Sequence, residues 1–472
     1  MRISNVPIDP NNARDVWNKL LTSKRLGRTT PPGYEDVDRN DFERDYDRIV
    51  FSNAFRRLQD KTQVFPLSKN DNTRTRLTHS IEVSCVGRSL GRKVQRFLAK
   101  HQPLPANSSD VPTIIAAACL AHDIGNPPFG HSGEAAIQEW AKKNVAADGK
   151  PKFLVKTSQQ ARDLHEFEGN AQAIRVLSRI QWRRRLGGMQ LTLATLGTMM
   201  KYPCGSVINE QSRNKGRVEQ KKFGYFEDER ELIVPALREL GMLEYETDAF
   251  SRHPLAFLVE AADDICYAII DLEDSVDQKV ITDKEASDLL EPLVKRVREG
   301  ATFNDYGYEG RARIEWYRAY AIQALVTECA KVFEDHIADI LNGELHASLI
   351  DLSDTRDEYN EVKKVVKGKA YKDHRVLEVE AAGFQVISGL LDYFAPALVT
   401  PESERSKAEE KLFWLFNEGY LQKPGDKVDR EEAILSLTTY QRLLAATDYI
   451  SGMTDSFAVD LYQKLSGIRL PS

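Results

Sequence analysis

The segment that begins at Pro254 constrains the fold more than any other part of the chain. Proline fits the first turn of a helix, and apolar side chains then recur at spacings of four, three, four, three and four residues. This period places them on one face of a helix. The segment therefore predicts a long helix with one buried face, formed by Leu258, Ala262, Ile265, Ile269, Leu272 and Val276.

Helical periodicity dominates from about Asp45 onward, and no segment shows sustained strand alternation with hairpin turns. The run TIIAAACLAHD is short and made largely of small residues, which let helices approach closely, so it predicts a central buried helix. Further helices are expected in 311–343, 374–395, 405–419 and 431–467. Irregular loops are expected in 66–74, 101–110, 142–160 and 205–228.

These patterns predict an all-α fold with a helical core over 44–300 and additional C-terminal helices over 301–472 packed on it. Residues 1–43 are polar and rich in Asn, Asp, Arg and Pro. They predict an irregular N-terminal arm that packs on a partner subunit.

The composition is that of a soluble globular protein, with 42% hydrophobic and 29% charged residues. A net charge of −6 argues against nucleic-acid binding through the whole surface. Five scattered cysteines without a CxxC pair favour a reducing cytoplasm. The first residues have no apolar signal-peptide core, and the apolar run Ile114–Ala121 is too short to span a membrane. We expect a cytoplasmic protein that does not enter a membrane.

The stretch LAHDIGNPPFGHSGEAAI, residues 120–137, crowds two histidines and two carboxylates around a Gly-Pro-Pro break. Imidazole and carboxylate groups suit Zn, Mn, Fe and Mg, depending on the mix. His122 and Asp123 are adjacent, so both could reach an ion between helices if other helices supplied further ligands. His79 is the first candidate, although a lone histidine is more often structural.

The helix after Pro254 carries a second candidate feature, a polar stripe opposite its apolar face. This stripe is either an ordinary solvated face or the wall of a cleft. Its members are Glu260, Asp263, Tyr267, Asp271 and Asp274.

The basic run QWRRRLGG, residues 181–188, is usually a solvated surface. Trp182 beside three arginines could instead hold single-stranded nucleic acid through charge and stacking. The chain has no P-loop, dinucleotide-binding loop or serine or cysteine nucleophile motif.

The order H…HD…D resembles that of the HD superfamily of metal-dependent phosphohydrolases. Longer motifs look like the deoxyguanosine triphosphate triphosphohydrolase (dGTPase) family, and RLQDKTQVFPL and TRTRLTHS are nearest to its enterobacterial type. The other motifs are HDIGNPPFGHSGEAAI, FEGNAQAIRVL, KKFGYFEDE, EAADDICYAIIDLED and DYISGMTDSFAVDLYQKL. The resemblance covers about residues 45–465. It implies hydrolysis of dGTP, and of other dNTPs, to deoxynucleoside and inorganic triphosphate.

The same resemblance implies one divalent metal per subunit, Mg or Mn first, with Fe, Co or Zn as alternatives. Asp263 is preferred to Asp264 because the family has a tyrosine four residues and an aspartate eight residues after its metal aspartate. The implied ligands are His79, His122, Asp123 and Asp263.

The resemblance also implies substrate contacts. Arg76, Lys201 and Lys222 would bind phosphates, with Lys221 as the fallback for Lys222. Gln63 would read the sugar 3′-hydroxyl, Tyr267 would contact phosphate, and Asp271 would steady the sugar end or a neighbouring basic residue. Arg442 is the candidate for the base.

His131 and Glu134 complete the implied site. After the Gly-Pro-Pro break His131 would return to the metal cavity, and Glu134, one turn later, would orient it. His131 would either position the water or donate a proton to the departing 5′-oxygen.

Two other classes remain open. One is an HD-domain phosphodiesterase or nucleotidase acting on a different nucleotide. The other is a nucleic-acid-binding protein that uses the HD fold as a scaffold. The family forms tetramers and hexamers, so a homo-oligomer is expected.

Overall fold

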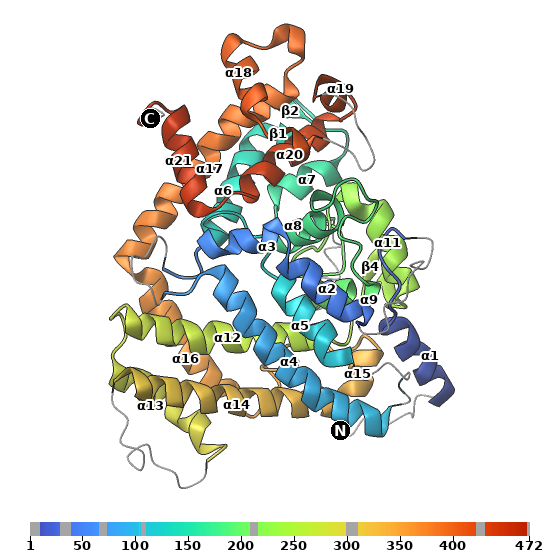
Figure 1. The fold of residues 1–472 in the computed structure, drawn as a ribbon, viewed down its shortest axis with the longest axis vertical. Coiled ribbons are helices and arrows are strands. Elements are labelled where there is room, and N and C mark those ends of the chain that lie inside the picture. Colours follow the sequence, from blue (N-terminus) through green and yellow to red (C-terminus); the bar gives the residue numbers. More distant parts are fainter. Residues whose placement is uncertain are drawn as a thin grey trace.

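The fold is taken from a computed structural model that describes residues 10–28, 39–65, 73–102, 104, 110–207, 216–298, 310–421 and 430–469. Helices make up most of this part of the chain (Figure 1), which confirms the all-α fold class. The strands among these residues form two short pairs: β1 (Val145–Ala146) with β2 (Phe153–Leu154) in parallel, and β3 (Glu244–Glu246) with β4 (Ala249–Phe250) antiparallel.

The helices that surround the predicted metal ligands come from the first two thirds of the chain. They are α1 (Pro10–Leu20), α2 (Asp41–Val50), α3 (Asn53–Arg57), α4 (Arg76–His101), α5 (Val111–Ala121), α6 (Gly130–Asn144), α7 (Ser158–His165), α8 (Gly169–Arg175), a π-helical turn (Val176–Ile180), α9 (Leu193–Met199), α11 (Arg230–Glu239), α12 (Ala256–Asp277) and α13 (Asp283–Lys295).

The remaining helices pack against both ends of this group. They are α14 (Arg311–Asp335), α15 (Ile337–Leu341), α16 (Arg356–Lys369), α17 (His374–Val399), α18 (Lys407–Leu415), α19 (Arg430–Leu435), α20 (Thr439–Ser451) and α21 (Asp455–Leu465).

Helix α5 is the central buried helix that its small residues predict. It packs on α4, α2, α9 and α12. A Cβ atom added to Gly87 on α4 would lie 2.5 Å from Sγ of Cys119 on α5, so the absence of a side chain at Gly87 permits this close approach. Helix α12 follows Pro254 as expected and packs against α4, α13 and α14 (Figure 1).

Two clusters of buried apolar side chains hold the molecule together. The first contains Val83, Ala118 and Ile265, from α4, α5 and α12. The second contains Ala136 and Phe394, from α6 and α17, together with much of α20. The stretch between His122 and His131 passes from the first cluster to the second, so the candidate site lies where they meet.

Helix α17 is long and apolar enough to cross a membrane by length and composition, and half of its most apolar window is buried. It packs against α6, α18, α20 and α21. These contacts are those of a core helix.

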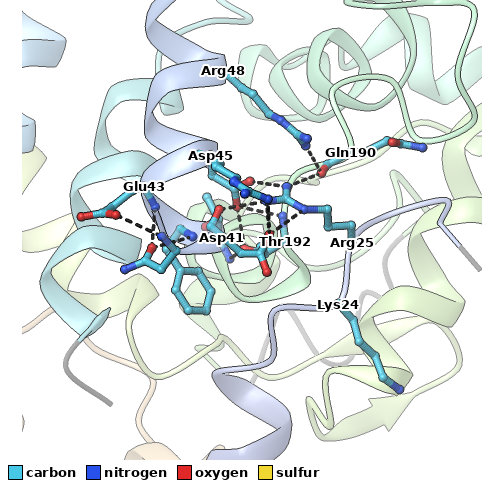
Figure 2. Close-up of polar contacts among 12 residues, drawn as sticks. Lys24, Arg25, Asp41, Glu43, Asp45, Arg48, Gln190 and Thr192 are labelled. Carbon is cyan, nitrogen blue, oxygen red and sulfur yellow. Dashed lines mark hydrogen bonds and ion pairs between the residues drawn. The ribbon is translucent and has the colours of Figure 1, made fainter. Parts of the chain in front are cut away.

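The expectation of an irregular arm over 1–43 is wrong for residues 10–20, which form α1. Trp17 is fully buried in this chain's own core, because an indole in the middle of a short amphipathic helix removes a large apolar surface from water. After α1, Arg25 forms ion pairs with the start of α2. Figure 2 shows Arg25 between Asp41 and Asp45, with Oδ1 of each carboxylate 2.7 Å from the guanidinium.

Asp45 is fully buried, and its second oxygen accepts hydrogen bonds from the Thr192 amide and hydroxyl at 2.8 and 2.6 Å. Arg48 donates to the Gln190 carbonyl from the same helix (Figure 2). A satisfied buried pair of this kind fixes geometry, and removal of one partner typically costs about 3–5 kcal/mol.

Some expected boundaries are also wrong. The segment 431–467 is three helices, interrupted near Leu437 and Gly452, and 311–343 breaks at His336. Helix α16 has no counterpart among the expected helices. The expected loop 142–160 contains β1 and β2, and 205–228 contains a short 3₁₀ turn at Val218–Gln220. The expected loops 66–74 and 101–110 lie mostly outside the described residues.

Candidate metal and phosphate site

Three of the four predicted metal ligands converge between α4, α5 and α12. One ligand atom each from His79, His122 and Asp263 lies within 4.8 Å of the others. Oδ1 of Asp263 lies 3.1 Å from Nε2 of His79 and 3.4 Å from Nε2 of His122. The polar stripe of α12 is not an ordinary solvated face, because its members Glu260, Asp271 and Asp274 are buried.

Asp123 lies beside this group and is held by two neighbours. Its Oδ1 is 3.6 Å from Nε2 of His122 and accepts a hydrogen bond from Nδ2 of Asn126 at 2.5 Å. Its Oδ2 accepts from Arg76 at 2.7 Å. The predicted ligand set is therefore gathered in one place, and the predicted phosphate arginine is part of the same cluster.

The chemistry of the donor set fits a divalent cation. Nδ1 of His122 lies 2.6 Å from the Cys119 carbonyl oxygen, and a carbonyl can only accept, so Nδ1 carries the proton. Nε2 then has its lone pair free and faces two carboxylates. Such a second partner is the usual way in which a ligating histidine is oriented.

The electrostatics of the cluster favour positive charge. Burial lowers the pKa of His122, but Asp123 and Asp263 outweigh this effect and raise it to about 9. Burial raises the pKa of Asp263, whereas His122 and His79 reverse the effect and hold it well below its usual value. A cation among the same atoms would satisfy both carboxylates without a proton on His122.

His131 and Glu134 lie on the first turns of α6. Nδ1 of His131 is 3.0 Å from Oε2 of Glu134, and this hydrogen bond raises the pKa of His131. Oε1 of Glu134 accepts from the Gly169 amide at 2.8 Å. The His131 side chain is 80% exposed, whereas that of Glu134 is 8% exposed. The structure therefore presents an accessible imidazole on a fixed carboxylate.

The two predicted phosphate lysines lie near the same cluster. Nζ of Lys222 is 2.8 Å from Glu168, and Glu134 and Glu168 raise its pKa although burial lowers it. Nζ of Lys201 is 3.1 Å from Oε1 of Glu260. Lys201 and His122 line the same small cavity. Each lysine is paired with a carboxylate, which a bound phosphate could replace as its partner.

Two of the predicted substrate contacts, Tyr267 and Asp271, lie on α12 beside Tyr371. Tyr267 stacks on Tyr371 with ring centres 5.9 Å apart, and the Tyr371 hydroxyl donates to Oδ2 of Asp271 at 2.6 Å. Oδ1 of Asp271 and Oε1 of Gln63 are buried and have no hydrogen-bond partner within the part of the chain that the structure describes. Burial raises the pKa of Asp271 well above its usual value.

Arg442 lies apart from these residues in its contacts. Its guanidinium donates to the carbonyl oxygens of Leu437, between α19 and α20, and of Val399, at the end of α17, at 3.1 and 3.3 Å. None of the hydrogen bonds described for it joins the metal cluster.

Sequence reasoning missed several side chains of the site. Asn126 donates a hydrogen bond to Asp123, and Glu168 pairs with Lys222. Tyr371 stacks on Tyr267 and donates to Asp271. Arg252 forms a buried ion pair of 2.7 Å with Glu260. Asn126 stands inside the HDIGNPP stretch and Glu168 inside FEGN, so their motifs were visible. Tyr371 and Arg252 stand outside those motifs, and no local pattern marked them.

Comparison with known proteins gives the same family along the chain. Residues 76–195 match the HD domain, and residues 397–464 match the phosphohydrolase-associated domain. A "Deoxyguanosinetriphosphate triphosphohydrolase-like protein" from Synechocystis sp. is 41% identical over 96% of this chain and 100% of its own length. A protein with the same name from Listeria innocua is 36% identical over 96% of this chain and 99% of its own length. A "Deoxyguanosinetriphosphate triphosphohydrolase" from Klebsiella pneumoniae is 33% identical over 96% and 99%. The chain belongs to the deoxyguanosinetriphosphate triphosphohydrolase family of HD-domain proteins.

Proposed function

We propose that this protein is a metal-dependent hydrolase of deoxynucleoside triphosphates, with dGTP preferred, and that its products are deoxynucleoside and inorganic triphosphate. The observation that carries the proposal is the convergence of His79, His122, Asp123 and Asp263 beside Arg76. The names of nearly full-length relatives support the same activity.

The basic side chains near the cluster would bind the triphosphate. A triphosphate carries about four negative charges, and a chain that is acidic overall needs local cations to attract it. Arg76 is 9% exposed in its side chain and already oriented by Asp123, so it suits the phosphate next to the metal. Lys201 and Lys222 would exchange Glu260 and Glu168 for phosphate oxygens.

His131 and Glu134 would serve proton transfer at the scissile bond. Glu134 is fixed by the Gly169 amide and can hold the imidazole in one orientation. Its negative charge also stabilises the protonated imidazole. His131 would therefore donate a proton to the departing 5′-oxygen or hold the attacking water, the two roles open from the sequence.

His79, His122, Asp123 and Asp263 would hold one divalent ion per subunit, for which Mg²⁺ or Mn²⁺ is proposed and Fe, Co or Zn are alternatives. Such an ion polarises a phosphoryl oxygen and lowers the pKa of a bound water. The mix of imidazole and carboxylate fits this group of metals.

The sugar and base assignments extend the proposal. Gln63 would read the 3′-hydroxyl through its unpartnered buried oxygen, and Tyr267 would contact phosphate and leave little room for a 2′-hydroxyl. Asp271 would steady the sugar end together with Tyr371. Arg442 is the proposed base contact. To reach a base it would exchange its hydrogen bonds to the Val399 and Leu437 carbonyl oxygens.

A second property, binding of single-stranded DNA, is favoured by one specific feature. An open cavity of about 680 Å³ is lined by Trp182, Tyr420 and four arginines, Arg57, Arg183, Arg184 and Arg185. None of these arginines forms an ion pair with a carboxylate among the described residues. Trp182 is 44% exposed, and Arg183 lies over the Tyr420 ring at 4.3 Å. Charge and aromatic faces together suit a single strand.

The assembly and compartment are also proposed. A homo-oligomer, tetramer or hexamer, and a cytoplasmic location are the expectations that the family and the five free cysteines support. We also propose an N-terminal arm over 1–43, a core over 44–300 and a C-terminal region over 301–472.

The activity is tested by incubating the protein with each of the four dNTPs and with GTP, in Mg²⁺ or Mn²⁺, and measuring nucleoside release. We expect dGTP to be fastest, GTP to be far slower, and no release after chelation. A phosphodiesterase or another nucleotidase would leave all five intact and cleave another nucleotide. A scaffold protein would cleave none.

A further inference from the structure

We propose that Asp455, in the GMTD stretch at the start of α21, is a positioning residue for the catalytic loop, the segment 122–131 that joins α5 to His131 on α6. It would set the place of His131 relative to Arg76 and the metal ligands. The proposal rests on the proposed function, because it assigns a role within the same site. Asp455 does not touch the cluster itself and is 1% exposed.

One oxygen of Asp455 holds the residue that precedes α6. Oδ1 accepts a hydrogen bond from the Phe129 amide at 3.0 Å. Phe129 has a φ of +61°, in the left-handed region that L side chains rarely adopt. Its amide stands at the N-terminus of α6, where no helical partner exists. Asp455 therefore satisfies this amide and holds a strained turn two residues before His131.

The neighbouring Gly130 explains why the turn has to be placed accurately. Gly130 also has a positive φ, of +55°, and an added Cβ would lie 2.7 Å from a terminal nitrogen of Arg76. The backbone before His131 is thus packed directly against the proposed phosphate arginine. A small displacement of Phe129 would change the relation between Arg76 and His131.

The other oxygen of Asp455 holds a second segment of the site. Oδ2 accepts from the amide and hydroxyl of Thr62 at 2.9 and 2.5 Å. Thr62 pairs with Thr75 in an isolated bridge, and the Arg76 amide donates to the Lys61 carbonyl at 3.0 Å. This short segment lies against the start of α4, which carries Arg76 and His79. One carboxylate thus joins the start of α4 to the start of α6.

Lys61 forms a parallel link between the same elements. Its Nζ donates to the Asn126 and Ser451 carbonyl oxygens, both at 2.6 Å. Asn126 in turn donates to Asp123. The end of α20 and the start of α21 are therefore linked to the loop between His122 and His131 at two places, directly through Asp455 and indirectly from Ser451 through Lys61. These contacts give the C-terminal region a role in positioning the site.

A purely structural role for Asp455 is the competing account. An acidic residue in the first turn of a helix stabilises that helix through its dipole. In that case Asp455 would matter for α21 and for stability, but not for the chemistry at His131.

A double-mutant cycle separates the two accounts. Asp455→Asn keeps the size of the side chain but replaces one carboxylate oxygen by an NH₂ group, which cannot accept the hydrogen bonds that Thr62 and Phe129 now donate. Positioning predicts a fall in kcat for dGTP of about ten- to a hundredfold, since misplacement by about 1 Å can cost that much. Metal content should stay at the wild-type level. The same substitution in a His131→Ala background should change turnover less than twofold, because the group being positioned is absent.

Asp460→Asn is the matched control, because Asp460 lies on the same helix and pairs with Lys464 near the surface. It should leave kcat unchanged. Equal losses from Asp455→Asn in both backgrounds, or a kcat within twofold of wild type, would overturn the proposal. If Asp455→Asn does not fold, Thr62→Val removes one of its bonds and should give the same non-additive pattern, to a smaller extent.

Amide exchange distinguishes a failure of this proposal from a failure of the proposed function. If the wild-type protein does not cleave dGTP, the proposed function fails. Faster exchange of the Phe129 and Thr62 amides in Asp455→Asn, with unchanged exchange in Asp460→Asn, would still support the proposal that Asp455 holds these two segments. Unchanged exchange at both amides would overturn it.

Discussion

Nδ1 of His122 lies 2.6 Å from the carbonyl oxygen of Cys119, three residues earlier in the chain. This single hydrogen bond fixes the tautomer and aims Nε2 at Asp263 and Asp123. The end of α5 thus presents Nε2 of His122 to two carboxylates, and a divalent ion among these atoms would take the place of a proton on that nitrogen.

The metal assignment predicts which substitutions empty the site. His79→Ala, His122→Ala, Asp123→Ala and Asp263→Ala should each weaken metal binding by more than about a hundredfold, because loss of outer partners alone typically costs 10–100-fold. Asp264→Ala is the control on the same helix, since Asp264 is not a member of the cluster. Metal content after dialysis and a calorimetric titration give the readout. Loss of metal in Asp264→Ala but not in Asp263→Ala would contradict the assignment.

The His131–Glu134 pair predicts a separation of chemistry from binding. His131→Ala should keep its metal and its dGTP affinity but lose turnover by about 10²–10⁴-fold, the range for one positioned proton-transfer group. Glu134→Gln should lose less, and the double variant should be little worse than His131→Ala. Single-turnover rates, metal content and melting temperature are measured on the same proteins. A lower melting temperature with normal turnover would instead mean that the pair only braces α6.

The side chains of the candidate metal cluster could be picked out from the sequence because they stand in short motifs. The helical period places Asp263, Tyr267 and Asp271 on one face of a helix. Family resemblance then chose Asp263 over Asp264. In the structure, His79, His122 and Asp263 lie close together, and their role as metal ligands stays a prediction.

The remaining features depend on pairs far apart in the chain. Asp455 contacts Phe129 across 326 residues, and Tyr371 contacts Asp271 across 100. No periodicity encodes such a pairing. The helix at 10–20 was missed for a related reason, because a polar composition concealed Trp17 and Leu20, whose burial depends on the rest of the core.

His253 predicts a pH dependence of stability. It is fully buried, lies 2.9 Å from the Leu20 carbonyl oxygen, and burial lowers its pKa to about 4. Below about pH 6.5 the unfolded state binds a proton that the native state resists, so stability falls as the pH falls from about 6.5 to 4. By pH 5 this group should have cost about 2 kcal/mol.

The control for this effect is His253→Gln, which cannot titrate. Urea unfolding at pH 7.5 and pH 5 should show a smaller loss of stability in the variant than in the wild type. Parallel losses in both proteins would mean that His253 is not the group responsible.

The arginine-lined cavity predicts salt-dependent binding of single-stranded DNA. Arg184→Glu with Arg185→Glu should weaken binding of a labelled oligonucleotide at least about tenfold at low salt and reduce the slope of log Kd against log salt, because fewer counterions are released. Trp182→Ala should weaken binding with the slope unchanged, because stacking does not depend on salt. Lys364→Glu, an exposed charge on α16, is the control. Equal binding by all four proteins would exclude the cavity as the DNA site.

The bond that is broken tests the central claim most directly. The protein is incubated with dGTP and Mn²⁺, and the products are identified by phosphorus NMR and anion-exchange chromatography. The account predicts deoxyguanosine and intact inorganic triphosphate in equal amounts, with both absent in His122→Ala. Formation of dGMP with pyrophosphate, or of dGDP with phosphate, would contradict it.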